Sequence, residues 1–145
     1  MYKHTLIPTD GSELSESAIL KGVAVAKSMN AKVTGVTVSS TFHTIAVEPM
    51  MVTDTRAQYK KDCDARATKY LAAIEKAAKT IGVPYEGVHV FHDQPYEAII
   101  DTAANKGCDL IVMASHGRRG MQALVLGSET TKVLTHSKTP VLVLR

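Results

Sequence analysis

Residues 110–117 read LIVMASHG, and after nine further residues the pair Gly127-Ser128 opens a helix-like run to His136. An apolar run, a glycine-bearing loop and a helix start, in that order, are typical of a buried strand followed by a phosphate-binding turn. The N–H groups that a helix cannot pair in its first turn point at one spot, and the helix dipole favours negative charge there. A glycine lets an anion approach the backbone. This stretch therefore predicts a nucleotide or phosphate site.

Apolar, strand-like runs alternate with helical patterns along the rest of the chain. Strands are predicted at 5–9, 31–38, 85–91, 108–114 and 140–144, and helices at 12–29, 54–81, 95–107 and 128–136, with a long loop at 39–53. Such alternation predicts an α/β domain, Rossmann-like or flavodoxin-like, with a five-stranded parallel sheet and helices on both faces. We expect one domain over residues 1–145.

The placement of the strand ends sharpens the predicted site. In doubly wound sheets, ligands bind off the carboxyl ends of the strands, where the strand order reverses. The first strand ends at Pro8-Thr9-Asp10 and the fourth at Met113-Ala114. We expect these two ends to face each other across the ligand.

Composition excludes several other classes of protein. The chain has 145 residues, of which 45% are hydrophobic and 5% aromatic, and its formal net charge is +3. With so few aromatic rings and such scattered basic residues, we expect no nucleic-acid partner. No apolar run approaches the ~20 residues of a membrane span, and the N-terminus lacks the apolar core of a signal peptide. Cys63 and Cys108 have no metal-ligand spacing, so a reducing compartment is expected.

Several residues near the predicted site allow two interpretations. Gly127-Ser128 is either an ordinary turn and N-cap or part of a phosphate cradle. Asp10, with Glu13 three residues later, can cap the first helix, and its carboxylate can also meet a ribose hydroxyl or Mg²⁺; the two uses are compatible. His116 has no evident acid partner or nucleophile, so no catalytic residue is assigned. His89 and His92 lie near a strand end on opposite faces, so no metal site is expected.

Two familiar nucleotide motifs are absent. The chain has no GxxxxGK[ST], so it is not a P-loop NTPase. Its first strand–helix turn, residues 8–13, reads PTDGSE rather than GxGxxG, which disfavours an NAD-dependent dehydrogenase.

Three motifs in the right order resemble the universal stress protein family. They are IPTDGS at 7–12, DLIVMASHG at 109–117, and a tail with GS at 127–128 and PVLV at 140–143. The resemblance covers the whole chain. It implies a five-stranded parallel sheet with four main helices, a cytoplasmic location, and a homodimer paired through the last strand, Val141 to Leu144.

The ATP-binding branch of this family carries G-x-x-G-x9-G-[ST], and Ala114 replaces its first glycine here. By resemblance, the Val38 backbone would meet the adenine, and three residues at the end of the first strand would border the ribose. The end of the fourth strand would form the floor of the site, and the glycine loop and the start of the last helix would hold the phosphates. The implied nucleotide-binding residues are Pro8, Thr9, Asp10, Val38, Met113, Ala114, Gly117, Gly127, Ser128, Glu129 and Thr130. A backbone N–H contact survives Gly→Ala where φ is negative and the methyl points away.

These observations lead to three functional hypotheses. The leading one is a stress-response protein that binds ATP, ADP or AMP, with or without Mg²⁺, and acts as a sensor or regulator with at most slow hydrolysis. The replacement at Ala114 motivates the second, a dimeric interaction module of the same family that binds no nucleotide. His116 beside the cradle motivates the third, a low-turnover ATPase.

Overall fold

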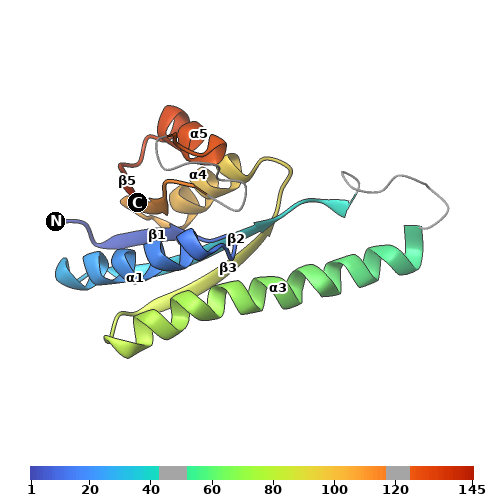
Figure 1. Cartoon of the computed structure of the whole chain (residues 1–145), viewed down its shortest axis with the longest axis horizontal. Helices are drawn as coiled ribbons and strands as arrows, with labels where there is room; N and C mark the ends of the chain where they lie inside the picture. Colours follow the sequence, from blue (N-terminus) through green and yellow to red (C-terminus); the bar gives the residue numbers. More distant parts are fainter. Residues whose placement is uncertain (43–51, 117–124) are drawn as a thin grey trace.

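The fold is a parallel sheet of five strands between two layers of helices (Figure 1). The computed structural model describes residues 1–42, 52–116 and 125–145. The strands are β1 (His4–Pro8), β2 (Lys32–Ser39), β3 (Tyr85–Phe91), β4 (Leu110–Ala114) and β5 (Val141–Leu144), in the spatial order β3-β2-β1-β4-β5. The helices are α1 (Glu13–Ser28), α3 (Val52–Thr80), α4 (Pro95–Lys106) and α5 (Ser128–His136). The predicted α/β class and parallel sheet are confirmed.

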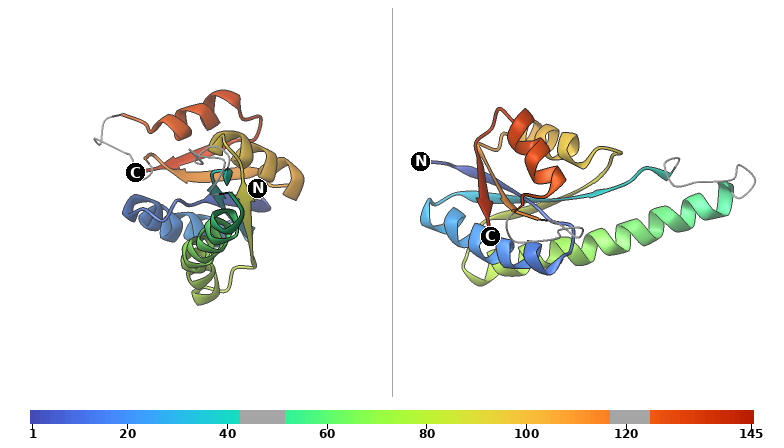
Figure 2. Two further views of the ribbon diagram at one scale, coloured as in Figure 1. Left: turned by 90° about the vertical axis from the view of Figure 1, so that its right-hand side faces the viewer. Right: turned by 45° about the horizontal axis from the view of Figure 1, so that its top comes forward.

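Each face of the sheet carries its own apolar core. Figure 2 shows α1 and α3 on one side and α4 and α5 on the other. Successive side chains of a strand point to opposite faces. Ile7 of β1 therefore packs with the α1–α3 layer, and its neighbour Leu6 packs with the α4–α5 layer. Burial of both faces explains why β4 is a continuous apolar run rather than an alternating one.

The first turn of α1 corrects the predicted cap. The N-cap is Ser12, whose side-chain oxygen accepts a hydrogen bond from the Ser15 N–H at 3.2 Å. Asp10 lies two residues earlier, and its Oδ1 accepts from the Ser12 N–H at 3.0 Å. Asp10 thus closes the turn before the helix, because a short polar side chain bonds readily to the backbone two residues on.

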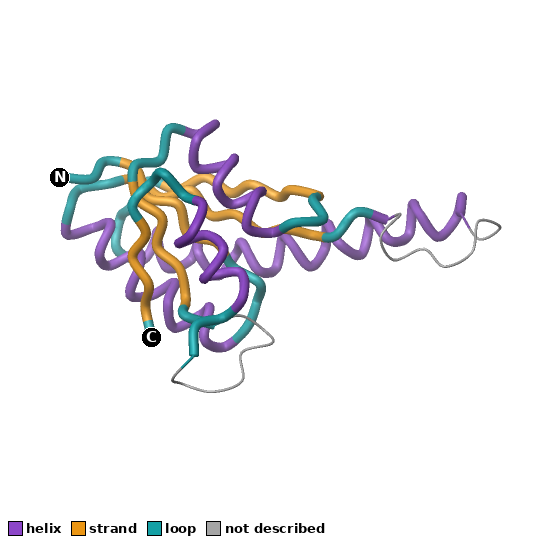
Figure 3. Tube along the Cα trace, turned by 90° about the horizontal axis from the view of Figure 1, so that it is seen from above, coloured by secondary structure: helices purple, strands orange, loops and turns teal. Residues whose placement is uncertain are grey.

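Helix α3 is the longest element of the chain. Its 29 residues span about 43 Å, and its N-terminal part extends past the end of the sheet (Figure 3). Its apolar stripe includes Cys63, Ala67, Ile74 and Ala78, which are all buried. Ile81 is an error of the prediction, because it follows the helix end and is 39% exposed.

The predicted long loop is shorter at both ends than expected. Strand β2 continues through Ser39, and α3 already begins at Val52. Within the described part of it, the Phe42 ring packs against Tyr59 with centroids 5.6 Å apart, and Arg56 lies over the same ring. Residues 43–51 lie outside the described part of the chain. Among the described helices, none combines the length and apolarity that crossing a bilayer requires.

Candidate functional site

The strand order reverses between β1 and β4. The chain leaves β1 toward β2 on one side, while β4 pairs with β1 on the other, with Leu6 opposite Ile111. The carboxyl ends of these two strands therefore lie side by side, as predicted. In parallel sheets this reversal leaves a crevice that the helix connections do not cover. The candidate site is the set of residues around this crevice.

Hydrogen bonds of Thr9 fix the loop after β1. The Thr9 N–H donates to the Val36 carbonyl at 2.9 Å, which continues the pairing of β1 with β2. The buried Thr9 hydroxyl oxygen accepts from the Gly11 N–H at 3.2 Å and from the Ser15 hydroxyl at 2.8 Å. Because these bonds occupy Thr9, its side chain supports the loop. Pro8 and Asp10 are half-buried at the rim.

Two hydrogen bonds fix the start of α5 against the end of β4. The Gly127 N–H donates to the Ser115 carbonyl at 2.7 Å, and the Thr130 hydroxyl donates to the Ala114 carbonyl at 3.0 Å. The first helical bond of α5 runs from the Thr131 N–H to the Gly127 carbonyl. The helix itself therefore provides no partner for the N–H groups of Ser128, Glu129 and Thr130.

These bonds refine the implied roles of the phosphate-side residues. The Gly127 N–H and the Thr130 hydroxyl already have partners within the protein. The Glu129 carboxylate accepts from the Tyr96 N–H at 2.9 Å, so it caps the first turn of α4 rather than facing an anion. Ser128 is exposed at the helix start. An anion at this position would meet backbone N–H groups and the Ser128 hydroxyl.

The end of β4 forms the floor of the crevice. Met113 is buried in the α4–α5 core, and Val38 of β2 packs against the same cluster. Among the described residues, Asn30 is the only non-glycine with positive φ, so Ala114 has negative φ. A glycine is therefore not required by the backbone at 114, and only the added methyl distinguishes this chain from the pattern. Gly117 lies outside the described residues.

His116 follows this floor and is buried. Its Nδ1 lies 2.9 Å from the Ser115 hydroxyl oxygen. Its Nε2 is buried without a hydrogen-bond partner among the described residues. The imidazole therefore contacts the hydroxyl of its sequence neighbour, and no acid partner approaches it within the described part of the chain.

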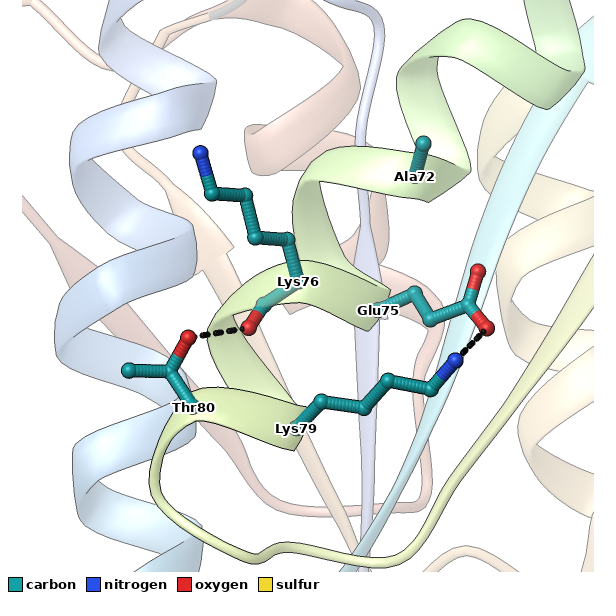
Figure 4. A pocket seen from close by; sticks show the side chains of 5 residues that line it. All are labelled: Ala72, Glu75, Lys76, Lys79 and Thr80. Carbon is teal, nitrogen blue, oxygen red and sulfur yellow. Dashed lines mark hydrogen bonds and ion pairs between the residues drawn. The ribbon is translucent and has the colours of Figure 1, made fainter.

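Besides a larger surface hollow elsewhere on the described residues, one hollow adjoins the crevice. It measures about 280 Å³ and lies between the β1–α1 loop and the middle of α3, with Thr9, Gly11 and Tyr70 in its wall. The other, about 460 Å³, lies over the last turns of α3 (Figure 4). Its wall is an exposed lysine-rich helix face with the ion pair Lys79–Glu75 at 2.7 Å, far along α3 from the strand ends. The smaller hollow is the relevant one.

A second polar group lies at the outer end of β2, and the sequence interpretation missed it. The His89 Nε2 lies 2.8 Å from the Ser39 hydroxyl oxygen, and its Nδ1 lies 3.2 Å from the Asp64 carboxylate. The sequence pattern around His89 bears only on a metal site. The three residues come from β2, β3 and α3, so no local spacing connects them. Only the pairing of β2 with β3 could have indicated this group from the sequence, because that pairing brings Ser39 and His89 together.

Comparison with known proteins identifies relatives over the full length. The model of the universal stress protein family matches residues 1–145. Universal stress protein YxiE of Bacillus subtilis is 30% identical over 153 residues, with all of both chains covered. Universal stress protein MJ0577 of Methanocaldococcus jannaschii is 29% identical, covering 100% of this chain and 96% of the relative.

Solved structures agree with these matches. The structure of MJ0577 superimposes with a TM-score of 0.84 over 99% of this chain and 96% of that one. More distant structures share the fold, among them a universal stress protein in complex with cAMP, at 23% identity, TM-score 0.68, and 99% and 97% coverage. Another is the universal stress protein of Archaeoglobus fulgidus in complex with dAMP, at 17% identity, TM-score 0.66, and 99% and 98% coverage. With the fold and the full-length match in agreement, the chain belongs to the universal stress protein family.

Proposed function

We propose that this protein binds ATP or a related adenine nucleotide in the crevice between β1 and β4 and acts as a stress sensor or regulator with at most slow hydrolysis. The observation that carries the proposal is the anchored start of α5, which presents three backbone N–H groups beside the end of β4. Such a helix start attracts phosphate through its unpaired donors and its dipole. The complexes of distant relatives with cAMP and dAMP support an adenine ligand.

The described residues suggest how the nucleotide would lie. The adenine would meet the backbone at Val38, the ribose would lie beside Pro8 and Asp10, and the phosphates would reach the start of α5. The Asp10 carboxylate would bind a ribose hydroxyl or share Mg²⁺ with the phosphates. Met113 and Ala114 would form the floor.

The test is calorimetric titration with ATP, ADP and AMP, comparing wild type with Ser128→Glu. A carboxylate in the first turn suits the helix dipole, so this variant keeps its fold, but its charge repels phosphate. We expect binding to weaken about tenfold or more, equivalent to ~1.4 kcal/mol. Thr55→Glu, which adds the same charge near the start of α3, is the control and leaves binding unchanged. Absence of binding at millimolar nucleotide would overturn the proposal.

The second candidate, a family member that functions without nucleotide, is favoured by Ala114 alone. If the methyl blocks the site, wild type binds no nucleotide and Ala114→Gly gains binding. If our proposal is right, wild type binds and Ala114→Gly changes the affinity only modestly. The same titration therefore separates the two candidates.

An ATPase is the third candidate, and a steady-state assay tests it. Turnover in the usual enzyme range of ~1–10³ s⁻¹ would favour catalysis over sensing. Hydrolysis unchanged in His116→Ala would clear His116 of a catalytic role.

We also propose a cytoplasmic location and a homodimer paired through β5, whose outer edge has no strand beside it in the described sheet.

A further inference from the structure

Ser39, His89 and Asp64 form a hydrogen-bonded line on the face of the sheet covered by α3. Strands β2 and β3 pair in parallel with Thr37 opposite His89 and Ser39 opposite Phe91. Because side chains alternate along a strand, Ser39 and His89 share one face. The hydroxyl-to-Nε2 distance is 2.8 Å and the Nδ1-to-carboxylate distance is 3.2 Å.

The direction of these bonds defines the imidazole tautomer. A carboxylate only accepts, so the His89 Nδ1 carries the proton and donates to Asp64. The His89 Nε2 is then a lone-pair acceptor for the Ser39 hydroxyl. Burial is the largest effect on the pKa of His89 and lowers it, which favours the neutral ring. The hydrogen bond from Lys60 is the largest effect on Asp64 and lowers the pKa of that carboxyl.

The neighbouring side chains hold the imidazole in place and leave the line accessible. The Phe91 ring lies 4.6 Å from the His89 ring, centroid to centroid. The His89 side chain is 16% exposed and that of Asp64 is 46% exposed, and Ser39 is half-buried. Water could solvate a serine hydroxyl in such a place, so the fold does not require the histidine as its partner.

We propose that Ser39 is a nucleophile, with His89 as its general base and Asp64 as the positioning residue, for acyl transfer from activated carboxylic esters. A nucleophile bonded to a base that a third group orients is the arrangement that defines this chemistry, whatever the fold. The Ser39 oxygen attacks the ester carbonyl while its proton passes to the His89 Nε2. The tetrahedral intermediate collapses, and the alcohol leaves with that proton. Water, deprotonated by the same nitrogen, then releases the carboxylic acid and restores the serine.

This site is separate from the proposed nucleotide site. Val38, the residue before Ser39, packs into the α4–α5 core, whereas Ser39 faces α3. A change of the Ser39 hydroxyl therefore leaves the nucleotide crevice intact. A protein that binds nucleotide but shows no acyl transfer contradicts only the present proposal. A protein that shows acyl transfer but binds no nucleotide contradicts only the proposed nucleotide function.

Two probes test the nucleophile. p-Nitrophenyl acetate has a good leaving group, so its acylation makes small demands on charge stabilisation. A fluorophosphonate labels activated serines, and mass spectrometry locates the label. We expect the fluorophosphonate on Ser39 and p-nitrophenol release that falls about 100-fold or more in Ser39→Ala and His89→Gln. Ser40→Ala, at the adjacent exposed serine, keeps the wild-type rate.

Thermal unfolding of each variant establishes that it is folded, and ¹⁵N spectra of the imidazole test the role of Asp64. In wild type we expect the proton of the neutral His89 ring on Nδ1. In Asp64→Ala we expect the imidazole to lose its preference for this tautomer and fluorophosphonate labelling to slow. The unfolding midpoint of this variant should stay near that of wild type. Label on another serine, or a rate of labelling that His89→Gln leaves unchanged, would overturn the proposal.

Discussion

At Ala114, the methyl group that replaces the motif glycine is compatible with the backbone conformation and affects only the approach of a ligand. The residue ends β4 opposite Leu144 of β5 and has negative φ, so an alanine suits the strand as well as a glycine would. Its carbonyl accepts from Thr130, which fixes α5 at the crevice. The motif glycine therefore matters only where a ligand approaches. This is why the titration of Ala114→Gly is informative.

His4 is a buried histidine whose environment predicts a pH dependence. Its Nε2 lies 2.7 Å from the Thr34 hydroxyl oxygen. Burial and then the charge of Lys32 lower its pKa, and Glu86 and Asp109 oppose this. A histidine with a lowered pKa binds fewer protons folded than unfolded, so its contribution to stability is complete above about pH 6.5 and is lost as the pH falls through the folded-state pKa.

We therefore expect a lower free energy of unfolding at pH 5.5 than at pH 7.5, measured by urea denaturation. His4→Gln should reduce this difference without removing it, because the pKa of His89 is lowered as well. The exposed-residue variant His136→Gln is the control for replacing a histidine. An equal pH dependence in wild type and His4→Gln would contradict the prediction.

At the scale of elements, the β1–α1 turn is fitted to α3 through Gly11. Its φ is +79°, and an added Cβ would lie 2.3 Å from the Tyr70 ring. Gly107, the C-cap of α4, has φ +70° with nothing within 4 Å of such a Cβ. Both positions carry the same backbone strain, but only the first adds a clash between elements.

Gly107→Ala should lower the free energy of unfolding by about 1 kcal/mol. Gly11→Ala should lower it by more, about 2–4 kcal/mol, because the ring of Tyr70 must also move. Urea denaturation of both variants measures the difference. In a Tyr70→Ala background, which lacks the ring, Gly11→Ala should lower the free energy of unfolding by about as much as Gly107→Ala does. If Gly11→Ala lowers it as much as in the wild-type background, the clash with Tyr70 is not the cause.

At the scale of the whole molecule, β5 is an edge of the sheet. Leu142 on β5 is 36% exposed and Leu134 on α5 is 41% exposed. An unpaired edge with apolar side chains is a template for association, and proteins cover it or charge it. This supports the proposed homodimer through residues 141–144.

Leu142→Glu should convert the proposed dimer to a monomer, because two like charges would meet across the symmetric interface. Sedimentation velocity measures the mass. Leu20→Glu, at a 66% exposed position on α1, is the control and should remain dimeric. A Leu142→Glu dimer as stable as wild type would place the interface elsewhere.

How far the sequence predicted the fold depends on its local signals. β3 and α5 have the predicted bounds, 85–91 and 128–136, because turn residues mark their ends. The predicted start of β4, Cys108, is two residues earlier than the observed start, Leu110. Cys108 is buried like a strand residue, but its N–H bonds back to Ala103 of α4. Burial alone does not distinguish a strand from the turn before it.

By itself the sequence determined the alternation of strands and helices and the glycine-bearing turn, because periodicity and turn residues act over a few positions. It therefore located the crevice between Pro8 and Ala114. Only the tertiary structure decided which donors remain at that crevice, since the bonds of Gly127, Glu129 and Thr130 join separate elements. It also brought Ser39, Asp64 and His89 together from positions up to 50 residues apart. Contacts between distant segments depend on strand order and register, which no local pattern encodes.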